Sequence, residues 1–330
     1  MAHTEETDKM MVEMLEWWGV PTLFRAEYAK DPADADIALV GVPHSSGNNS
    51  TWRDQHLGPR AVRNISANAR RYHEAFDIMA WDSVRVKDLG DVPLPEASDN
   101  EKSVERISDF YRKIAAAGTR PVSIGGDHGI TGAIVQAIAG EGSPLTGGKK
   151  AALLHFDAHT DAYDGLDHWL GSKKSAANWA AYLVKQGNVD ASKSVQFGMR
   201  GNPRGPNWLQ RSYELGYDVV TMKRYREIGA AETIKLIQER VGDAPLYITF
   251  DLDCLDPSVA PGVSNPEAGV CGFNIDQVVE VLRAMRGFNV IGGDVVCLMP
   301  TRDLPNQVTA MIAAAVMHEL VALIADRIKA

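Results

Sequence analysis

The most constraining feature of this 330-residue sequence is the repeated alternation of short apolar runs with amphipathic segments. Apolar runs such as residues 36–43, 120–126 and 244–250 alternate with helix-like stretches such as 101–118 and 273–288. Apolar strands that alternate with helices form parallel sheets whose two faces are covered by those helices. The sequence therefore predicts an α/β fold, a three-layer αβα sandwich around a mostly parallel central sheet.

The domain organisation follows from the continuity of this alternation. No linker, low-complexity tract or internal repeat interrupts it, so we expect one domain over residues 1–330, with 1–35 as an N-terminal helical extension packed on it. The most apolar stretch, near the C-terminus, is interrupted by His318, Glu319 and Asp326. That pattern predicts a buried or subunit-facing helix, not a membrane span.

Charge and cysteine content narrow the possible functions. The formal net charge is −9 and the sequence pI is about 5.5, which argues against nucleic acid or an anionic membrane as the main partner. Three scattered cysteines do not suggest a disulfide framework or a zinc knuckle. No basic segment leads into an apolar core at the N-terminus, so no signal peptide is expected and a cytoplasmic location is predicted.

The stretch "LHFDAHTDAYD" (154–164) places Asp157, His159 and Asp161 on alternate positions after an apolar run. Alternate side chains of a strand share a face, so all three are expected to project to one place. Carboxylates and an imidazole that converge in this way need a cation between them. The simpler alternative is a polar strand end that faces water.

Two other strand ends carry the same kinds of group. His128 follows the strand "RPVSIGG", while Asp251 and Asp253 follow "APLYITF" with the same alternate spacing. Ligands of open parallel sheets bind at the carboxyl ends of the strands, so these loops are expected to meet. Their four carboxylates and two imidazoles suit two divalent ions of the manganese type, with nickel or cobalt as other possible occupants. Such a pair of ions lowers the pKa of a shared water and makes hydrolysis possible near neutrality.

The motifs "GGDHG", "DAHTD" and "FDLDCLDP", in this order and spacing, resemble those of the ureohydrolase family of arginases and agmatinases. The similarity spans nearly the whole chain, from "GVPHSSGNNSTWRDQHLGPRAVR" to "GGDVVCLMP". The resemblance implies the arginase fold and hydrolysis of a guanidino group by two metal ions, Mn²⁺ or Ni²⁺.

The resemblance also implies a role for each matching residue. The first ion would be held by His128, Asp157, Asp161 and Asp251, and the second by His159 and Asp253, with Asp157 and Asp251 bridging. Asp161 would also orient the attacking hydroxide. His168 is the nearest match to the family's proton-shuttling histidine, although a loop histidine exposed to water is the simpler interpretation.

Several substrate-facing positions depart from the family pattern. Cys297, in "DVVCLMP", stands where relatives carry a glutamate that binds the guanidinium. Glu267 and Asn265, in the altered loop "PGVSNPEAGV", are candidate substrate-binding residues, and Glu267 is a possible replacement carboxylate. Trp169 and Trp179 are candidates for an aromatic wall, with ordinary packing as the alternative for Trp179. Cys297 as a covalent nucleophile is a further alternative.

Intact metal ligands beside an altered pocket favour the family reaction on a different substrate. We expect an alkylguanidine or a biguanide such as metformin, with agmatine or 4-guanidinobutyrate as alternatives. A different class of function is a non-catalytic subunit that supports an active paralogue. A single-zinc amide hydrolase of the histone-deacetylase type fits less well, because the carboxylates are doubled. The family resemblance implies a homo-oligomer (trimer or hexamer) or a hetero-oligomer with a paralogous subunit.

Overall fold

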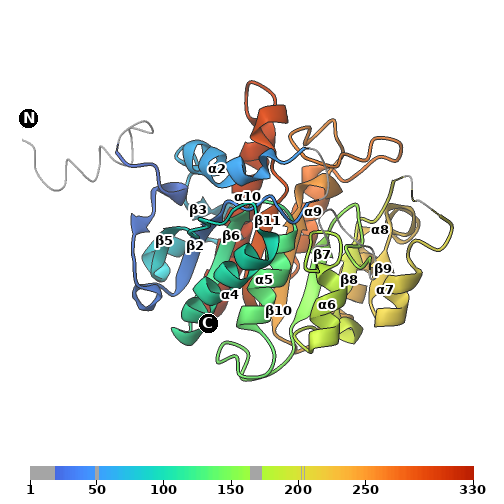
Figure 1. Ribbon diagram of the computed structural model, residues 1–330, viewed down its shortest axis with the longest axis horizontal. Helices are drawn as coiled ribbons and strands as arrows, with labels where there is room; N and C mark the ends of the chain where they lie inside the picture. Colours follow the sequence, from blue (N-terminus) through green and yellow to red (C-terminus); the bar gives the residue numbers. More distant parts are fainter. Residues whose placement is uncertain (1–18, 49–51, 164–172, 202, 204) are drawn as a thin grey trace, which may run out of the picture.

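The computed structural model describes residues 19–48, 52–163, 173–201, 203 and 205–330 (Figure 1). Its centre is a nine-stranded sheet with the order β1-β5-β2-β6-β11-β10-β7-β8-β9, in which neighbouring strands pair in parallel. The strands are β1 (Glu27–Tyr28), β2 (Ile37–Val42), β5 (Val86–Asp91), β6 (Arg120–Gly125), β7 (Ala152–Phe156), β8 (Val195–Phe197), β9 (Asp218–Val220), β10 (Leu246–Asp251) and β11 (Val290–Val296). The predicted parallel sheet is confirmed.

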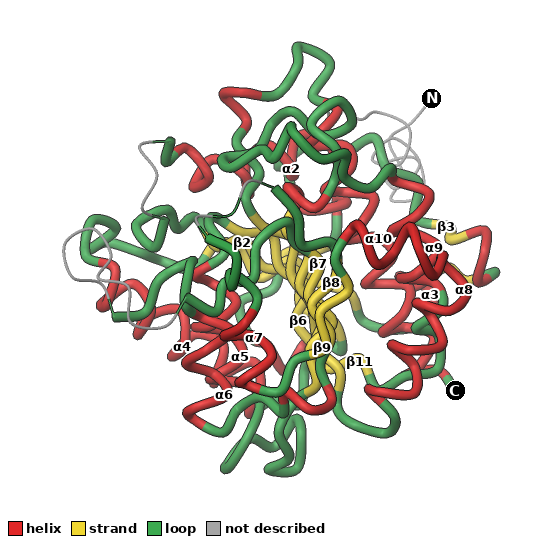
Figure 2. The backbone as a smooth tube through the Cα atoms, turned by 90° about the vertical axis from the view of Figure 1, so that its right-hand side faces the viewer, coloured by secondary structure: helices red, strands yellow, loops and turns green. Residues whose placement is uncertain are grey.

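Helices cover both faces of this sheet, as Figure 2 shows. One layer contains α4 (Asn100–Ala116), α5 (Gly129–Ile138), α6 (Trp179–Gln186) and α7 (Gln210–Leu215). The other contains α2 (Gly58–Ser66), α3 (Ala80–Ser83), α8 (Met222–Val241), α9 (Ile275–Arg283) and α10 (Val308–Lys329). Each layer buries its own hydrophobic cluster against one face, which explains why central strands such as β2 and β10 are buried along their whole length. The expected three-layer αβα sandwich is confirmed.

The helical extension expected over residues 1–35 is described only in part. Residues 1–18 lie outside the described residues. Between residues 19 and 35 the chain forms two 3₁₀ turns and strand β1, which pairs with β5 at the edge of the central sheet. Strand β5 itself was not anticipated, because its sequence "VKDLGD" mixes charged residues into the run. Outside the main sheet, β3 (Tyr72–His73) and β4 (Ile78–Met79) form a two-stranded antiparallel sheet.

Helix α10 is long and apolar enough to cross a membrane by length and composition alone. In the fold it is a core helix: 72% of its most apolar 18-residue stretch is buried, and it packs on β11, α2 and α9. Its apolarity is therefore explained by burial against the sheet. This agrees with the buried helix predicted for this stretch.

The topology brings four strand ends together. Strands β6, β11, β10 and β7 are neighbours at the middle of the sheet, and all point the same way. The loops after them contain the residues singled out from the sequence. Because these strands lie far apart in the chain, only the parallel pairing makes their carboxyl ends adjacent.

Candidate metal centre

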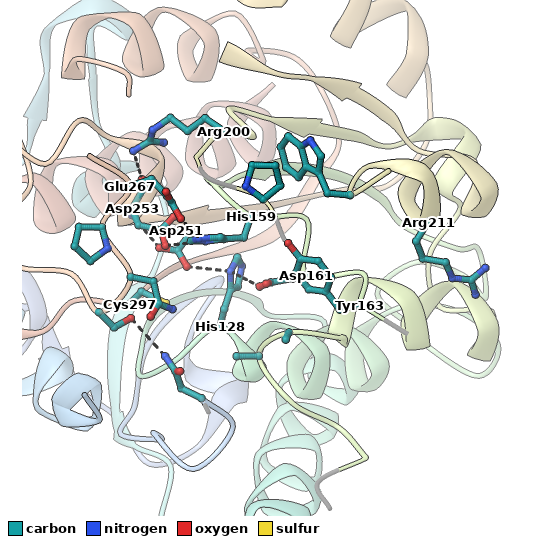
Figure 3. Close-up of a pocket in the computed structure, with 18 of the residues that line it drawn as sticks. His128, His159, Asp161, Tyr163, Arg200, Arg211, Asp251, Asp253, Glu267 and Cys297 are labelled. Atoms are coloured by element: carbon teal, nitrogen blue, oxygen red, sulfur yellow. Dashed lines mark hydrogen bonds and ion pairs between the residues drawn. The ribbon is translucent and has the colours of Figure 1, made fainter. Parts of the chain in front are cut away.

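Each predicted metal-binding side chain is placed by the end of one central strand. His128 lies at the N-terminal cap of α5 just after β6, and Asp157, His159 and Asp161 follow β7. Asp251 is the last residue of β10, and Asp253 lies in the following 3₁₀ turn, η7 (Leu252–Cys254). Figure 3 shows side chains from β6, β7 and β10 pointing toward one another. The structure thus brings together the six residues that the motifs singled out.

The ring of His128 lies at the centre of the first group. Its Nδ1 atom is 2.9 Å from Oδ2 of Asp157, 3.0 Å from Oδ2 of Asp161 and 3.1 Å from Oδ2 of Asp251. One ring nitrogen cannot donate a hydrogen bond to three oxygens, and the angles at Nδ1 do not fit a hydrogen bond to any of them. One nitrogen and three oxygens that face one another in this way are typical of the ligand atoms around a metal ion.

The ring of His159 faces the second group. Its Nδ1 atom lies 3.1 Å from Oδ2 of Asp253 and 3.3 Å from Oδ1 of Asp157. Asp157 thus contributes to both groups, and the ligand atoms of this trio lie within 4.8 Å of one another. Oδ2 of Asp253 is buried and has no hydrogen-bond partner among the described residues.

Backbone amides fix the orientation of the carboxylates. Oδ1 of Asp157 accepts from the N–H of His159 at 2.6 Å, and Oδ1 of Asp251 accepts from the N–H of Asp253 at 2.9 Å. Oδ1 of Asp253 accepts from the N–H of Ala158 at 3.1 Å. The amide in each case holds one oxygen, so that the other is directed at the neighbouring histidine.

The electrostatics of the cluster favour bound cations. Burial lowers the pKa of His128, but the close carboxylates of Asp157, Asp161 and Asp251 raise it well above its ordinary value. The pKa of Asp253 is also raised well above its usual range, by burial and by the charge of Asp251. Crowded, buried carboxylates therefore draw positive charge to themselves, as a proton or as a metal ion.

The donor set fits two divalent ions. Carboxylate oxygens and imidazole nitrogens suit manganese, nickel or cobalt as ligands. Nδ1 of His128 and Oδ2 of Asp253 are buried without a hydrogen-bond partner among the described residues, so both atoms can serve as metal ligands. His155 also falls in the first geometric group, but its Nε2 donates to Oδ2 of Asp157 at 2.8 Å. We therefore assign it as a partner of that ligand.

Asp161 has a second neighbour that the sequence interpretation treated differently. The indole N–H of Trp179 donates to Oδ2 of Asp161 at 2.8 Å. Trp179 is fully buried, and its ring is tilted against those of His128 and His155 at centroid distances of 4.8 Å. It therefore packs against the cluster in the core and is not among the residues that line the pocket. Asp161 adopts a left-handed backbone conformation, with φ of 46°. Its oxygen is held in this turn by the indole.

A pocket of about 1010 Å³ opens above the cluster. Cys297 directly follows β11 and lines it, near Asp251. Burial and the charges of Asp251 and Asp253 raise the pKa of this thiol well above its ordinary value. A neutral thiol is a poor nucleophile, which argues against covalent catalysis by Cys297.

The other predicted substrate residues have different outcomes. Asn265 and Glu267 line the pocket, and Oε1 of Glu267 lies 3.3 Å from Nε2 of His159. His168 and Trp169 lie outside the described residues. Glu267 is therefore aimed at least in part at a metal-binding candidate, which the sequence interpretation did not foresee.

Some lining and supporting residues were missed from the sequence. Tyr163 and Trp208 line the pocket, and Tyr163 could have been found because it continues the alternate spacing after Asp161. Arg200 is buried and donates to the carbonyls of Asp253, Cys254, Leu255 and Val270, which fixes the loop after β10. No local sequence pattern signals that role.

Comparison with known proteins agrees with this geometry. The model of the Arginase family matches residues 35–322. The guanidinopropionase of Pseudomonas aeruginosa is 37% identical over 309 residues, covering 93% of this chain and 92% of the relative. The mitochondrial agmatinase of Gallus gallus is 33% identical and covers 93% of this chain and 86% of that protein.

A solved structure gives the same result. Proclavaminate amidino hydrolase from Streptomyces clavuligerus superposes with a TM-score of 0.86 at 26% identity, covering 94% of this chain and 99% of that one. The family match, the relatives and the buried histidine–aspartate cluster agree with one another. The chain therefore belongs to the arginase family and is a hydrolase of carbon–nitrogen bonds in linear amidines.

Proposed function

We propose that this chain is a binuclear-metal amidinohydrolase whose preferred substrate is an N-alkylated guanidine or a biguanide. The products would be urea or a urea derivative and an amine. The observation that carries the proposal is Cys297, a buried neutral thiol in the pocket wall beside Asp251. The ureohydrolase motif places a glutamate there, and its loss removes a charge-assisted hydrogen bond to a simple guanidinium of about 1.5–3 kcal/mol.

The six clustered residues would hold the ions, with Asp157 and Asp251 shared between them. When bound, two divalent ions of the manganese or nickel type would lower the pKa of water at the site and polarise the guanidine carbon. The oxygen and imidazole donors support either metal, since both accept such ligands. The oriented carboxylates described above supply the chain's part of this site.

The remaining steps are assigned to side chains. Trp179 and His128 contact Oδ2 of Asp161, so we assign its Oδ1 to accept the hydrogen bond that orients the attacking water. The water oxygen bonds to the guanidine carbon, and one carbon–nitrogen bond breaks. The departing nitrogen must then receive a proton, and we propose His168 as its donor, on the family resemblance alone.

The shape and chemistry of the pocket support an alkylated substrate. Aromatic side chains of Trp52, Tyr163 and Trp208 line it. Aromatic faces attract methylated, delocalised cations without needing a carboxylate. Trp52 already stacks beneath the guanidinium of Arg302, with 3.6 Å between Cζ and the ring centroid.

A second candidate is a guanidino acid or agmatine. It is favoured by the similarity to a guanidinopropionase and to agmatinases. A carboxylated substrate needs a cation at the far end of the pocket, and Arg211 is among the lining residues. In Figure 3, however, its guanidinium points away from the cluster around His159, and its Nη1 lies near Glu214. This arrangement favours the alkylguanidine over a guanidino acid.

The test is urea release from protein reconstituted with manganese and with nickel in parallel. The panel contains agmatine, arginine, 4-guanidinobutyrate, 3-guanidinopropionate, guanidine, methylguanidines and metformin, with Asp157→Asn as the inactive control. Turnover confined to alkylguanidines or biguanides supports the proposal. Turnover of guanidino acids or agmatine overturns the substrate assignment.

A non-catalytic role makes a different prediction. If the ion-loaded chain released no urea from any substrate, this would favour a subunit that supports an active paralogue. We propose a homo-oligomer, trimer or hexamer, as the working assembly, and a hetero-oligomer with a paralogous subunit as its alternative. Light scattering of the purified chain distinguishes an assembled homo-oligomer from a chain that needs a partner.

A further inference from the structure

One row of side chains across the middle of the central sheet is polar, although the strands are covered on both faces. Pairing in register places five residues side by side on five neighbouring strands: Ser123, Asp294, Thr249, His155 and Gln196. All five are fully buried. Strands in such a position normally carry apolar residues, so this polar row needs a reason.

The polar row lies directly beneath the metal centre. Thr249 and His155 each come two residues before a carboxylate of the cluster, Asp251 and Asp157, on the same face of the same strand. Its partners in the helical layer are on the same side as His128: Thr131 of α5 bonds Asp294, and Tyr111 of α4 bonds Ser123.

Asp294 is the acceptor on which the row depends. Three hydroxyl groups donate to its carboxylate: Thr249 at 2.6 Å, Tyr247 at 2.7 Å and Thr131 at 2.9 Å. A carboxylate only accepts hydrogen bonds, so each of these hydroxyls donates its single hydrogen to Asp294.

The consequence for His128 follows from counting protons. Nε2 of His128 lies 2.9 Å from Oγ1 of Thr249. Because the proton of Thr249 is donated to Asp294, its oxygen must accept from His128, and Nε2 must therefore carry the hydrogen. In the neutral imidazole the other nitrogen, Nδ1, then carries the lone pair that can bind a metal ion. Nδ1 is also the atom that faces Asp157, Asp161 and Asp251.

We propose that Asp294, acting through Thr249, is a positioning residue that fixes the tautomer and orientation of His128 for metal binding. This inference rests on the proposed metal site. Partners of the non-ligating nitrogen of a metal-binding histidine change metal affinity by 10–100-fold when they are removed. Asp294 touches neither the cluster nor the pocket, so its effect passes through Thr249.

Thr249→Val is the central test, because valine keeps the shape and removes the hydroxyl. We expect its affinity for Zn²⁺, measured by competition with a chelator, to fall by about 10–100-fold. Thr249→Ser keeps the hydroxyl and is expected to retain nearly wild-type affinity. Asp294→Leu is expected to weaken binding like Thr249→Val, and the valine–serine pair carries the test if the leucine variant does not fold.

A spectroscopic measurement separates positioning from general damage to the fold. In the Zn²⁺-loaded protein with ¹⁵N-labelled histidine, the Nε2–H of His128 is expected to be protected from solvent exchange in the wild type and in Thr249→Ser. It is expected to lose that protection in Thr249→Val. His128→Ala identifies the resonance.

The same set of variants separates the two proposals. Full ion content in His128→Ala would overturn the metal site itself. Loss of an ion from His128→Ala, with wild-type Zn²⁺ affinity and a protected Nε2–H in Thr249→Val, would overturn the positioning role alone.

Discussion

Oε1 of Glu267 lies 3.3 Å from Nε2 of His159 (Figure 3). The Nδ1 atom of the same ring faces Asp157 and Asp253. One ring therefore joins a pocket-lining carboxylate to the metal centre. A carboxylate in this position orients a histidine ligand and increases its basicity. Glu267 thus has a partner within the site before any substrate is considered.

Glu267→Gln should weaken metal binding. The amide keeps the shape but loses the charge, so we expect metal affinity to fall by about 10-fold, and Glu267→Ala to lower it further, toward about 100-fold. Chelator competition measures both values. Glu232→Gln, on the exposed side of α8, is the matched control and should leave affinity unchanged. Unchanged metal affinity combined with a raised KM would instead show that Glu267 binds the substrate.

Gly201→Ala should produce the same defect without touching Glu267 itself. A Cβ at Gly201 would lie 2.3 Å from Cδ and Oε2 of Glu267, and its φ of 103° is a region that side chains rarely adopt. We expect weaker metal binding and a loss of about 1–3 kcal/mol in the free energy of unfolding. Gly205→Ala is the control, because nothing lies within 4 Å of a Cβ there. Wild-type metal affinity in Gly201→Ala would show that Glu267 does not need its present position.

Cys297→Glu should change substrate preference. A carboxylate beside Asp251 restores a partner for a simple guanidinium, worth about 1.5–3 kcal/mol, or roughly 10- to 150-fold in kcat/KM. We expect kcat/KM to rise for agmatine or 4-guanidinobutyrate and to fall for alkylguanidines. Cys297→Ser keeps a small neutral group and should preserve the original order of substrates. An unchanged order in Cys297→Glu would mean that this position does not determine specificity.

Glu319 should make part of the stability depend on pH. It bonds Nε2 of His73 at 2.8 Å and the guanidinium of Arg283 at 2.7 Å. Burial raises its pKa, but these partners lower it more, to below its ordinary value of 4.5. A depressed pKa in the folded state contributes stability that is present above pH 4.5 and is lost as pH falls through the folded pKa.

Glu319→Gln should therefore lose stability at neutral pH, by about 1.5–3 kcal/mol, and less in acid. Urea unfolding at pH 7 and at about pH 3.5 measures the difference from the wild type. Glu232→Gln again serves as control. An equal loss at both pH values would mean that shape, not charge, explains the effect of Glu319.

The sequence was most informative where local pattern and topology agree. Apolar runs alternating with helices were enough to predict the layers, and alternate spacing in "DAHTD" and "DLD" was enough to group the carboxylates. Parallel pairing then made β6, β7 and β10 end at one place. Strand β5 was missed because a charged strand near the sheet edge lacks the apolar signature.

The supporting residues were harder to predict, because their roles depend on cross-strand register. Asp294 and Thr249 are 45 residues apart, and only the pairing of β10 with β11 makes them neighbours. The residue type of Trp179 allows either a pocket wall or ordinary packing, and the packing of α6 places its indole N–H against Asp161. Side-chain direction of this kind is set by tertiary packing, which residue types alone do not reveal.

Metal removal should destabilise the fold as well as abolish turnover. Ions that bind only the native state add stability of about 2.7 kcal/mol at a concentration 100 times Kd. Without them the carboxylates of Asp157, Asp251 and Asp253 repel one another at close range. We expect EDTA to lower Tm and to stop urea release, and Mn²⁺ or Ni²⁺ to restore both. Asp157→Asn, which lacks a shared ligand, should respond weakly to EDTA. A Tm that EDTA leaves unchanged in the wild type would show that the cluster holds no ion tightly enough to support catalysis.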